Sequence, residues 1–278
     1  MYASDPKFIA QNLTAIANSL RKVPIPVKTN ISYGLVDWDL LHSTVFSALY
    51  QPYTTFYPLA QSLAELAKGN AKPFYQLSET PGFSCDCSTG TGFSYPTQES
   101  GSFVICSDGG PLPRGLKFAK FYYHEMDTIA PWGGGIMSLN FLDCTGWPKF
   151  RRTNFQGPFS ATTNFPILLI GNTADPVTPL RSARKMSAGF KNSVLLRQDS
   201  AGHTSLSSPS SCTLQMIQDY FVNGLLPDEN TVCAIDGSPW PNLDEEMLAA
   251  KKSLSPKQQE LLRISRKLSR VFKVPRLA

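Results

Sequence analysis

The sequence lacks long hydrophobic runs and metal-binding cysteine patterns, and each absence excludes a class of protein. No apolar stretch in the 278 residues approaches the roughly 18 residues that a membrane-spanning helix needs. The six cysteines show neither the CxxC pairs of a zinc ribbon nor a haem or iron-sulfur spacing, and only three histidines are present. The sequence therefore predicts no metal and no cofactor. Its 42% hydrophobic and 17% charged residues leave a globular protein as the expected class.

Positive charge is concentrated near the C-terminal end of the chain. Residues 251–278 contain nine Lys and Arg against Glu260 alone, whereas the first 250 residues contain 17 basic and 20 acidic residues. A body without excess positive charge is not expected to bind nucleic acid. Residues 255–274 have the pattern of a basic amphipathic helix, which contacts a membrane surface or a partner groove, or else is a solvated extension or a helix docked on the body. Aromatic residues are not interleaved with the basic ones, which also disfavours nucleic acid.

Apolar residues at helical spacing predict that the first 160 residues are mostly helical. The expected helices cover residues 6–22, about 36–50, about 56–68 and about 103–128. Segments rich in Ser, Thr and Gly (78–101) or in Pro, Gly and aromatic residues (131–165) are typical of irregular structure with short helical pieces. No convincing series of strands is expected in this part.

The pattern changes at Phe165, where two short apolar runs predict buried strands. The runs span residues 165–171 and 193–197, and the residues between them predict a helix over 178–190, with Thr178 as its N-cap. A strand, a helix and a strand at this spacing form a right-handed parallel βαβ unit. A further helix is expected over about 210–223.

Two chemically active residues follow these strands. Asp175 lies after the first strand and His203 after the second, and the carboxyl ends of adjacent parallel strands meet at one edge of a sheet. An acid followed by a histidine in this frame matches the last two members of a Ser, Asp, His chain order. Taken singly, Asp175 would be a loop cap beside Pro176 and His203 a surface turn residue. The pair together favours a catalytic acid and base.

At these residues the chain resembles a known family. Residues 165–241, from PheProIleLeuLeuIleGlyAsnThrAlaAspPro through AlaGlyHisThrSer to ProTrpPro, look like the C-terminal domain of the tripeptidyl aminopeptidase-like serine peptidases of the α/β-hydrolase superfamily. Four upstream segments resemble that family's helical cap: 49–52, 56–69, 105–109 and 143–148. The resemblance covers most of residues 30–241.

The resemblance implies an α/β fold class: a partial α/β-hydrolase fold, comprising its last parallel strands and helices, with a mostly helical cap. Residues 1–160 would be the cap, 161–241 the α/β-hydrolase segment and 242–278 the basic amphipathic tail. Asp175 would be the triad acid and His203 the triad base, acting on peptides with a free N-terminus. The family is typically secreted, although the N-terminus shows no basic start followed by an apolar core. Glu125 or Asp127 would contact the substrate ammonium group, unless both are ordinary surface residues.

The family's serine nucleophile lies in a Gly-x-Ser-x-Gly motif, and this motif does not occur in the 278 residues. Gly82-Phe-Ser84 and Gly92-Phe-Ser94 lack the second glycine. The chain is therefore expected to be the C-terminal part of a hydrolase, inactive alone and dependent on the missing half for a peptide substrate. The alternative is a catalytically dead module that acts as a binding or interaction protein.

The same resemblance suggests how the cysteines pair. Cys212 and Cys233 would enclose a helical hairpin, and Cys106 with Cys144 would tie the cap together. Cys85 and Cys87 would either pair with cysteines in the missing half or remain free. The alternative is that all six cysteines are reduced thiols in the core.

Overall fold

The computed structural model describes the whole chain except residues 1–4, 80–96, 149–152, 154, 252–253 and 273–278. The chain divides into two compact units. The first comprises Met1–Phe46, Leu63–Gln156 and Arg276–Ala278, and the second comprises Ser47–Ser62 and Gly157–Pro275. Residues 47–62 thus belong to the second unit although they are distant in sequence from the rest of it.

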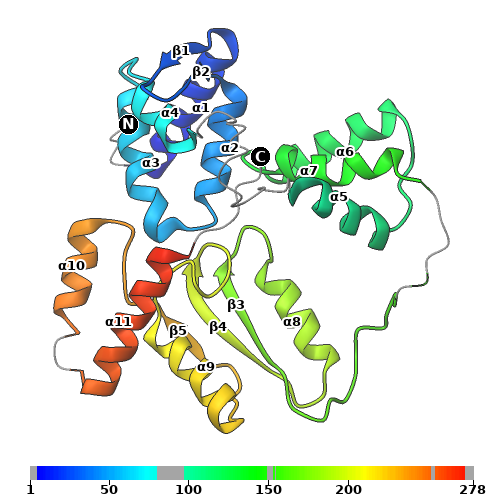
Figure 1. Ribbon diagram of the computed structural model, residues 1–278, viewed down its shortest axis with the longest axis vertical. Coiled ribbons are helices and arrows are strands. Elements are labelled where there is room, and N and C mark those ends of the chain that lie inside the picture. Colours follow the sequence, from blue (N-terminus) through cyan, green and yellow to red (C-terminus); the bar gives the residue numbers. More distant parts are fainter. Residues whose placement is uncertain (1–4, 80–96, 149–152, 154, 252–253, 273–278) are drawn as a thin grey trace, which may run out of the picture. The chain divides into compact units, whose positions relative to one another are not determined.

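The first unit is helical, with one small two-stranded sheet (Figure 1). Its elements are α1 (Pro6–Lys22), β1 (Ile25–Lys28), β2 (Tyr33–Val36), α2 (Trp38–Ala48), α4 (Lys72–Ser78), α5 (Thr97–Asp108), α6 (Leu116–Ile129), α7 (Gly134–Leu142) and the 3-10 helix η1 (Asp143–Gly146). The end of α2 and most of α3 (Pro52–Leu66) belong to the second unit. Leu20, Val36, Leu41 and Phe74 form the most buried part of the core.

The expectation of no strands in this unit was wrong for residues 25–36. β1 pairs antiparallel with β2, with Ile25 opposite Val36 and Lys28 opposite Tyr33. A turn over residues 29–32 connects the strands, and the Thr29 hydroxyl accepts hydrogen bonds from the backbone N–H groups of Ile31 and Ser32. A threonine side chain that satisfies the turn backbone in this way stabilises a hairpin too short to show a clear alternation of apolar residues.

The second unit contains the predicted parallel sheet, in the order β3-β4-β5. Its strands are β3 (Leu168–Ala174), β4 (Val194–Ala201) and β5 (Val232–Ala234), and its helices are α8 (Leu180–Gly189), α9 (Ser211–Asn223), α10 (Pro241–Ala249) and α11 (Pro256–Val271). β3, α8 and β4 form the expected βαβ unit. The unit is therefore a partial α/β fold. β3 and β4 both continue beyond the apolar runs that predicted them. The first polar residues after these runs, Asn172 and Gln198, are buried, and their side chains are hydrogen-bonded.

The basic amphipathic segment forms α11, which packs against α9. Leu261 and Leu262 are buried, and so is the guanidinium group of Arg266, which donates to the Asp236 carbonyl and to the Asp244 carboxylate. Ser255 caps the helix in a reciprocal capping box with Gln258. The apolar face of this helix is therefore docked on the second unit, which is one of the alternatives that the sequence left open. Within the described residues, no helix is both long and apolar enough to cross a membrane.

Candidate active site

Asp175 and His203 lie at the same edge of the parallel sheet. β3 and β4 pair from Leu168 opposite Val194 to Ala174 opposite Ala201, with a register shift between Asn172 and Ala174, and both strands end at one level. Asp175 follows the last residue of β3, and His203 comes two residues after the end of β4. His203 Nδ1 lies 3.1 Å from each carboxylate oxygen of Asp175. The structure therefore brings together the two residues that the sequence pattern singled out.

The Asp175 carboxylate is held by a loop that folds around it. Its side chain is only 3% exposed. It accepts hydrogen bonds from the backbone N–H groups of Val177 and Thr178, both at 2.8 Å, from the Thr178 hydroxyl at 2.9 Å and from the Thr204 N–H at 3.2 Å. Thr178 was expected to cap α8, but the helix begins after Pro179 without a side-chain cap. The Thr178 hydroxyl binds Asp175 instead.

These hydrogen bonds keep Asp175 ionised in spite of its burial. Burial raises the pKa of the carboxyl group, but the bonds from the backbone of Thr178, Val177 and Thr204 and from the Thr178 hydroxyl outweigh it, so the pKa lies below its usual range. The negative charge also contributes to the raised pKa of the Tyr50 phenol, after burial. An ionised acid beside Nδ1 places the ring proton on that nitrogen and leaves Nε2 as the basic atom.

His203 is positioned by contacts on both sides of its loop. Its backbone N–H donates to the Tyr50 carbonyl at 2.8 Å, and its ring meets the Tyr50 ring edge-on with centroids 5.4 Å apart. The preceding Gly202 has a φ of 101°, and a Cβ there would lie 2.6 Å from Pro52 Cδ and 2.7 Å from the Ser207 side chain. Only glycine fits this backbone. The Tyr50–Pro52 segment was predicted only as part of the cap resemblance, not as a support for the histidine.

Two buried amide side chains, those of Asn172 and Gln198, hold the loop that carries His203. Asn172 in β3 donates through Nδ2 to the carbonyls of Gly202 at 2.8 Å and Thr204 at 2.7 Å. Gln198 in β4 donates through Nε2 to the Ser200 hydroxyl and the Ser205 carbonyl. Sequence reasoning missed both residues. Each of these residues directly follows an apolar run in the sequence, and this position could have identified them.

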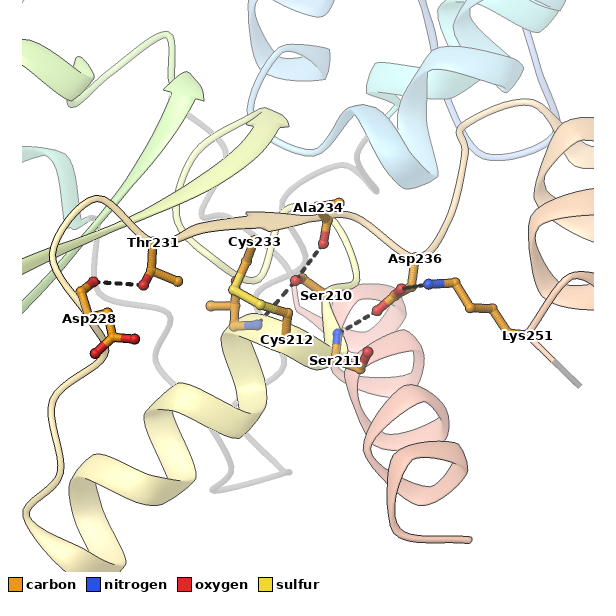
Figure 2. Close-up of a disulfide and its surroundings, with 10 residues drawn as sticks. Ser210, Ser211, Cys212, Asp228, Thr231, Cys233, Ala234, Asp236 and Lys251 are labelled. Carbon is orange, nitrogen blue, oxygen red and sulfur yellow. Dashed lines mark hydrogen bonds and ion pairs between the residues drawn. A yellow bond between two sulfur atoms is a disulfide. The ribbon is translucent and has the colours of Figure 1, made fainter. Parts of the chain in front are cut away.

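A disulfide ties the helix after this loop to the sheet. Cys212 in α9 is bonded to Cys233 in β5, as the resemblance suggested (Figure 2). Ser210 caps α9 by accepting from the Thr213 N–H, and its hydroxyl donates to the Ala234 carbonyl at 2.7 Å. The Asp236 carboxylate accepts from the Ser211 N–H and pairs with Lys251. These bonds hold the start of α9 against β5, the third strand of the sheet.

The other sequence candidates lie in the first unit or outside the described residues. Cys106 in α5 and Cys144 in η1 form the second expected disulfide. Glu125 and Asp127 lie on α6, the former exposed and the latter half-buried. Ser84, Ser94, Cys85 and Cys87 fall outside the described residues. In the part of the chain that the structure describes, no group of His, Cys, Asp and Glu could hold a metal ion.

The contacts of His203 are those of an imidazole that can hold and move a proton. Among the described residues His203 is hydrogen-bonded to Asp175, Thr178 and Tyr50, and to no serine hydroxyl. An imidazole whose Nδ1 faces a buried carboxylate can act as a general base through Nε2, and the carboxylate stabilises the imidazolium that forms.

The comparisons with known proteins agree with this geometry. The family model of the TAP-like proteins matches residues 130–233, a span that contains β3, α8, β4 and both Asp175 and His203. A search of the curated proteins found no match. Residues 130–233 are therefore similar to the TAP-like proteins of the α/β-hydrolases, which is consistent with the C-terminal part of a tripeptidyl aminopeptidase-like hydrolase.

Proposed function

We propose that this chain supplies the acid and the base of a serine peptidase that releases short peptides from free N-termini, with Asp175 as the acid and His203 as the base. The serine is provided by polypeptide that the 278 residues do not include, because they contain no Gly-x-Ser-x-Gly motif. In this assignment His203 Nε2 takes the serine proton, while Asp175 holds the ring and stabilises its charge. The chain alone has no turnover.

One observation carries the proposal. The Asp175 carboxylate accepts four hydrogen bonds from its own loop and from Thr204, and it faces the Nδ1 atom of His203 at 3.1 Å. A carboxylate that only capped a loop would not need a histidine aligned with both of its oxygens. The two disulfides further support a location in an oxidising compartment, such as that of a secreted protein.

The test is a fusion of this chain to the N-terminal half of a TAP-like hydrolase that carries the serine motif. Turnover of a tripeptide-linked fluorogenic amine is expected in the fusion. Asp175→Asn and His203→Ala should each lower the kcat of the folded fusion by roughly 10³ to 10⁶. The matched controls are Asp228→Asn and His124→Ala, because both residues are exposed.

Two outcomes would count against the proposal. If either site variant keeps near-full activity, the assignment of that residue is lost. If a folded fusion is inactive whatever residue stands at 175 or 203, the second function is favoured, a catalytically dead module that binds a partner. The absence of the serine motif is the observation that keeps this second function open.

A further inference from the structure

A groove with a cavity volume of about 660 Å³ lies between α10 and α11 in the second unit. It shares no lining residue with the candidate active site. Leu248 from α10 and Leu262 and Val271 from α11 give it an apolar lining. Leu248 and Val271 are 43% and 62% exposed, so apolar surface is open to solvent here. The volume lies within the range of about 300–1,000 Å³ that is typical of ligand sites.

Basic side chains surround this apolar surface. Lys251, Arg263, Arg266, Lys267 and Arg270 line the groove, and no acidic residue is among the described residues that line it. Three of the five have acidic partners: Lys251 pairs with Asp236, Arg263 with Glu260 and Arg266 with Asp244. Lys267 and Arg270 form no ion pair with an acid within the described part of the chain. The groove therefore presents uncompensated positive charge beside an apolar surface.

Arg266 gives the groove a fixed point. Its side chain is about 10% exposed, and its guanidinium group binds both oxygens of Asp244 in α10 and the carbonyl oxygen of Asp236. The guanidinium carbon also lies 5.9 Å from the centre of the Tyr53 ring. These contacts hold α11 to α10 and to α3, so the two sides of the groove are connected by a bidentate ion pair.

The shape of the groove selects among anionic ligands. The lining residues of α11 run from Gln259 to Val271, which is about 18 Å along the helix. A docked helix of that length would occupy about 1,400 Å³ at a diameter of 10 Å, more than the roughly 1,250 Å³ of space free of protein atoms in and above the groove, so part of the helix would remain outside. An extended peptide needs partners for its backbone N–H and C=O groups, but the backbone groups of two helices are already paired within each helix. A single alkyl chain is narrower than a helix, and it has no backbone N–H or C=O groups that need hydrogen-bond partners.

We propose that this groove binds a single-chain anionic amphiphile, with its alkyl chain along Leu248, Leu262 and Val271 and its carboxylate at Lys267 and Arg270. This ligand satisfies both properties of the groove. Burial of the alkyl chain covers exposed apolar surface, and the carboxylate meets positive charge that no described acidic residue neutralises, although Arg270 is hydrogen-bonded to Tyr53. The site is independent of the proposed hydrolase activity.

The test is isothermal titration calorimetry of the full chain with sodium dodecanoate below its micelle concentration. The double variant Lys267→Glu/Arg270→Glu should weaken binding about 20-fold or more, because each basic residue near an anionic head group contributes about fivefold. The matched control is Arg181→Glu/Arg184→Glu on α8, which makes the same charge change at exposed positions outside the groove. Leu248→Asp should also weaken binding, whereas Leu243→Asp should not, because Leu243 is 46% exposed on α10 but does not line the groove.

Different results would overturn the proposal. It fails if dodecanoate does not bind, if both charge variants weaken binding equally, or if dodecyltrimethylammonium binds as tightly as dodecanoate. Tighter binding of an octaglutamate peptide than of dodecanoate would assign the groove to acidic peptides instead.

Discussion

The Asn172 side chain donates a hydrogen bond of 2.7 Å to the carbonyl oxygen of Thr204, which joins β3 to the loop that carries His203. The same Nδ2 atom also donates to the Gly202 carbonyl and lies 3.2 Å from the Ser207 hydroxyl. Asn172 is 2% exposed, so these bonds are shielded from solvent. The residue therefore fixes the histidine from the neighbouring strand.

We expect Asn172→Ala to lower the free energy of unfolding by about 1–3 kcal/mol, because the buried Gly202 carbonyl on the histidine loop loses its donor, whereas the Thr204 carbonyl still accepts from Ser207. The His203 ring should also lose its fixed position, which NMR would report as a changed chemical shift of the imidazole protons. Asn242→Ala is the matched control, since Asn242 is exposed at the start of α10. An unchanged melting temperature and an unchanged His203 signal in the Asn172 variant would contradict this role.

The chain alone should not react with a fluorophosphonate probe for activated serines. Asp175 and His203 are the proposed acid and base, but within the described residues no serine is hydrogen-bonded to His203, and a serine without a base is a weak nucleophile. Intact-mass spectrometry after incubation should show unmodified protein. Stoichiometric labelling, mapped to a serine by peptide sequencing, would reveal a nucleophile outside the Gly-x-Ser-x-Gly pattern.

The part of the site that the sequence predicted depends on local patterns. Two apolar runs, one helix between them and a polar residue after each run are enough to place Asp175 and His203 at one sheet edge. The disulfide pairs were suggested by the family resemblance and are present. The groups that hold the acid in place are also local, because Val177 and Thr178 follow it directly.

The parts that were missed depend on contacts between distant segments. Tyr50 supports His203 across about 150 residues of chain, and Arg266 reaches Asp236 and Asp244 from a different helix. β5 has three residues, too few to show an alternation. The roles of these residues follow from tertiary packing, and propensity or periodicity does not reveal them.

The first unit contains a histidine whose protonation should affect stability. The His42 ring is stacked between Trp38 and Trp132, with centroid distances of 3.7 and 4.5 Å, and is 7% exposed. Burial lowers its pKa most strongly and the charge of Arg21 lowers it further, which together outweigh the Trp38 carbonyl, Asp127 and Asp39. The folded unit therefore favours the neutral imidazole.

A group with a lowered pKa stabilises the fold above its unfolded pKa, about 6.5 for histidine, and loses that contribution as the pH falls through the folded value. The melting temperature, followed by tryptophan fluorescence, should therefore fall as the pH is lowered from about 7 toward 5. His42→Phe keeps an aromatic ring in the stack but cannot be protonated, so this fall should be much smaller. His124→Gln, at an exposed position, should behave as the unchanged protein. The same pH dependence in the His42 variant would assign the effect to other groups.

The edge of the parallel sheet should make the isolated chain self-associate. Within the described residues β3 pairs with β4 on one side only, so its other side presents unpaired backbone groups. Each such group costs on the order of 1–3 kcal/mol when it is shielded from water without a partner, and an exposed row of them is a template for another strand. Phe165, just before this strand, is 81% exposed and adds apolar surface.

We expect size-exclusion chromatography with light scattering to show oligomers or aggregates rather than the 30.6 kDa chain. Phe165→Lys should reduce this association, because a charged residue at the start of an edge strand disfavours pairing with a second copy. Phe221→Lys is the matched control, since Phe221 is 79% exposed on α9 and lies outside the sheet. A sharp 30.6 kDa monomer with a cooperative melt would show instead that the chain is self-sufficient. In that case the proposal of a hydrolase part that needs its missing half would give way to the binding module.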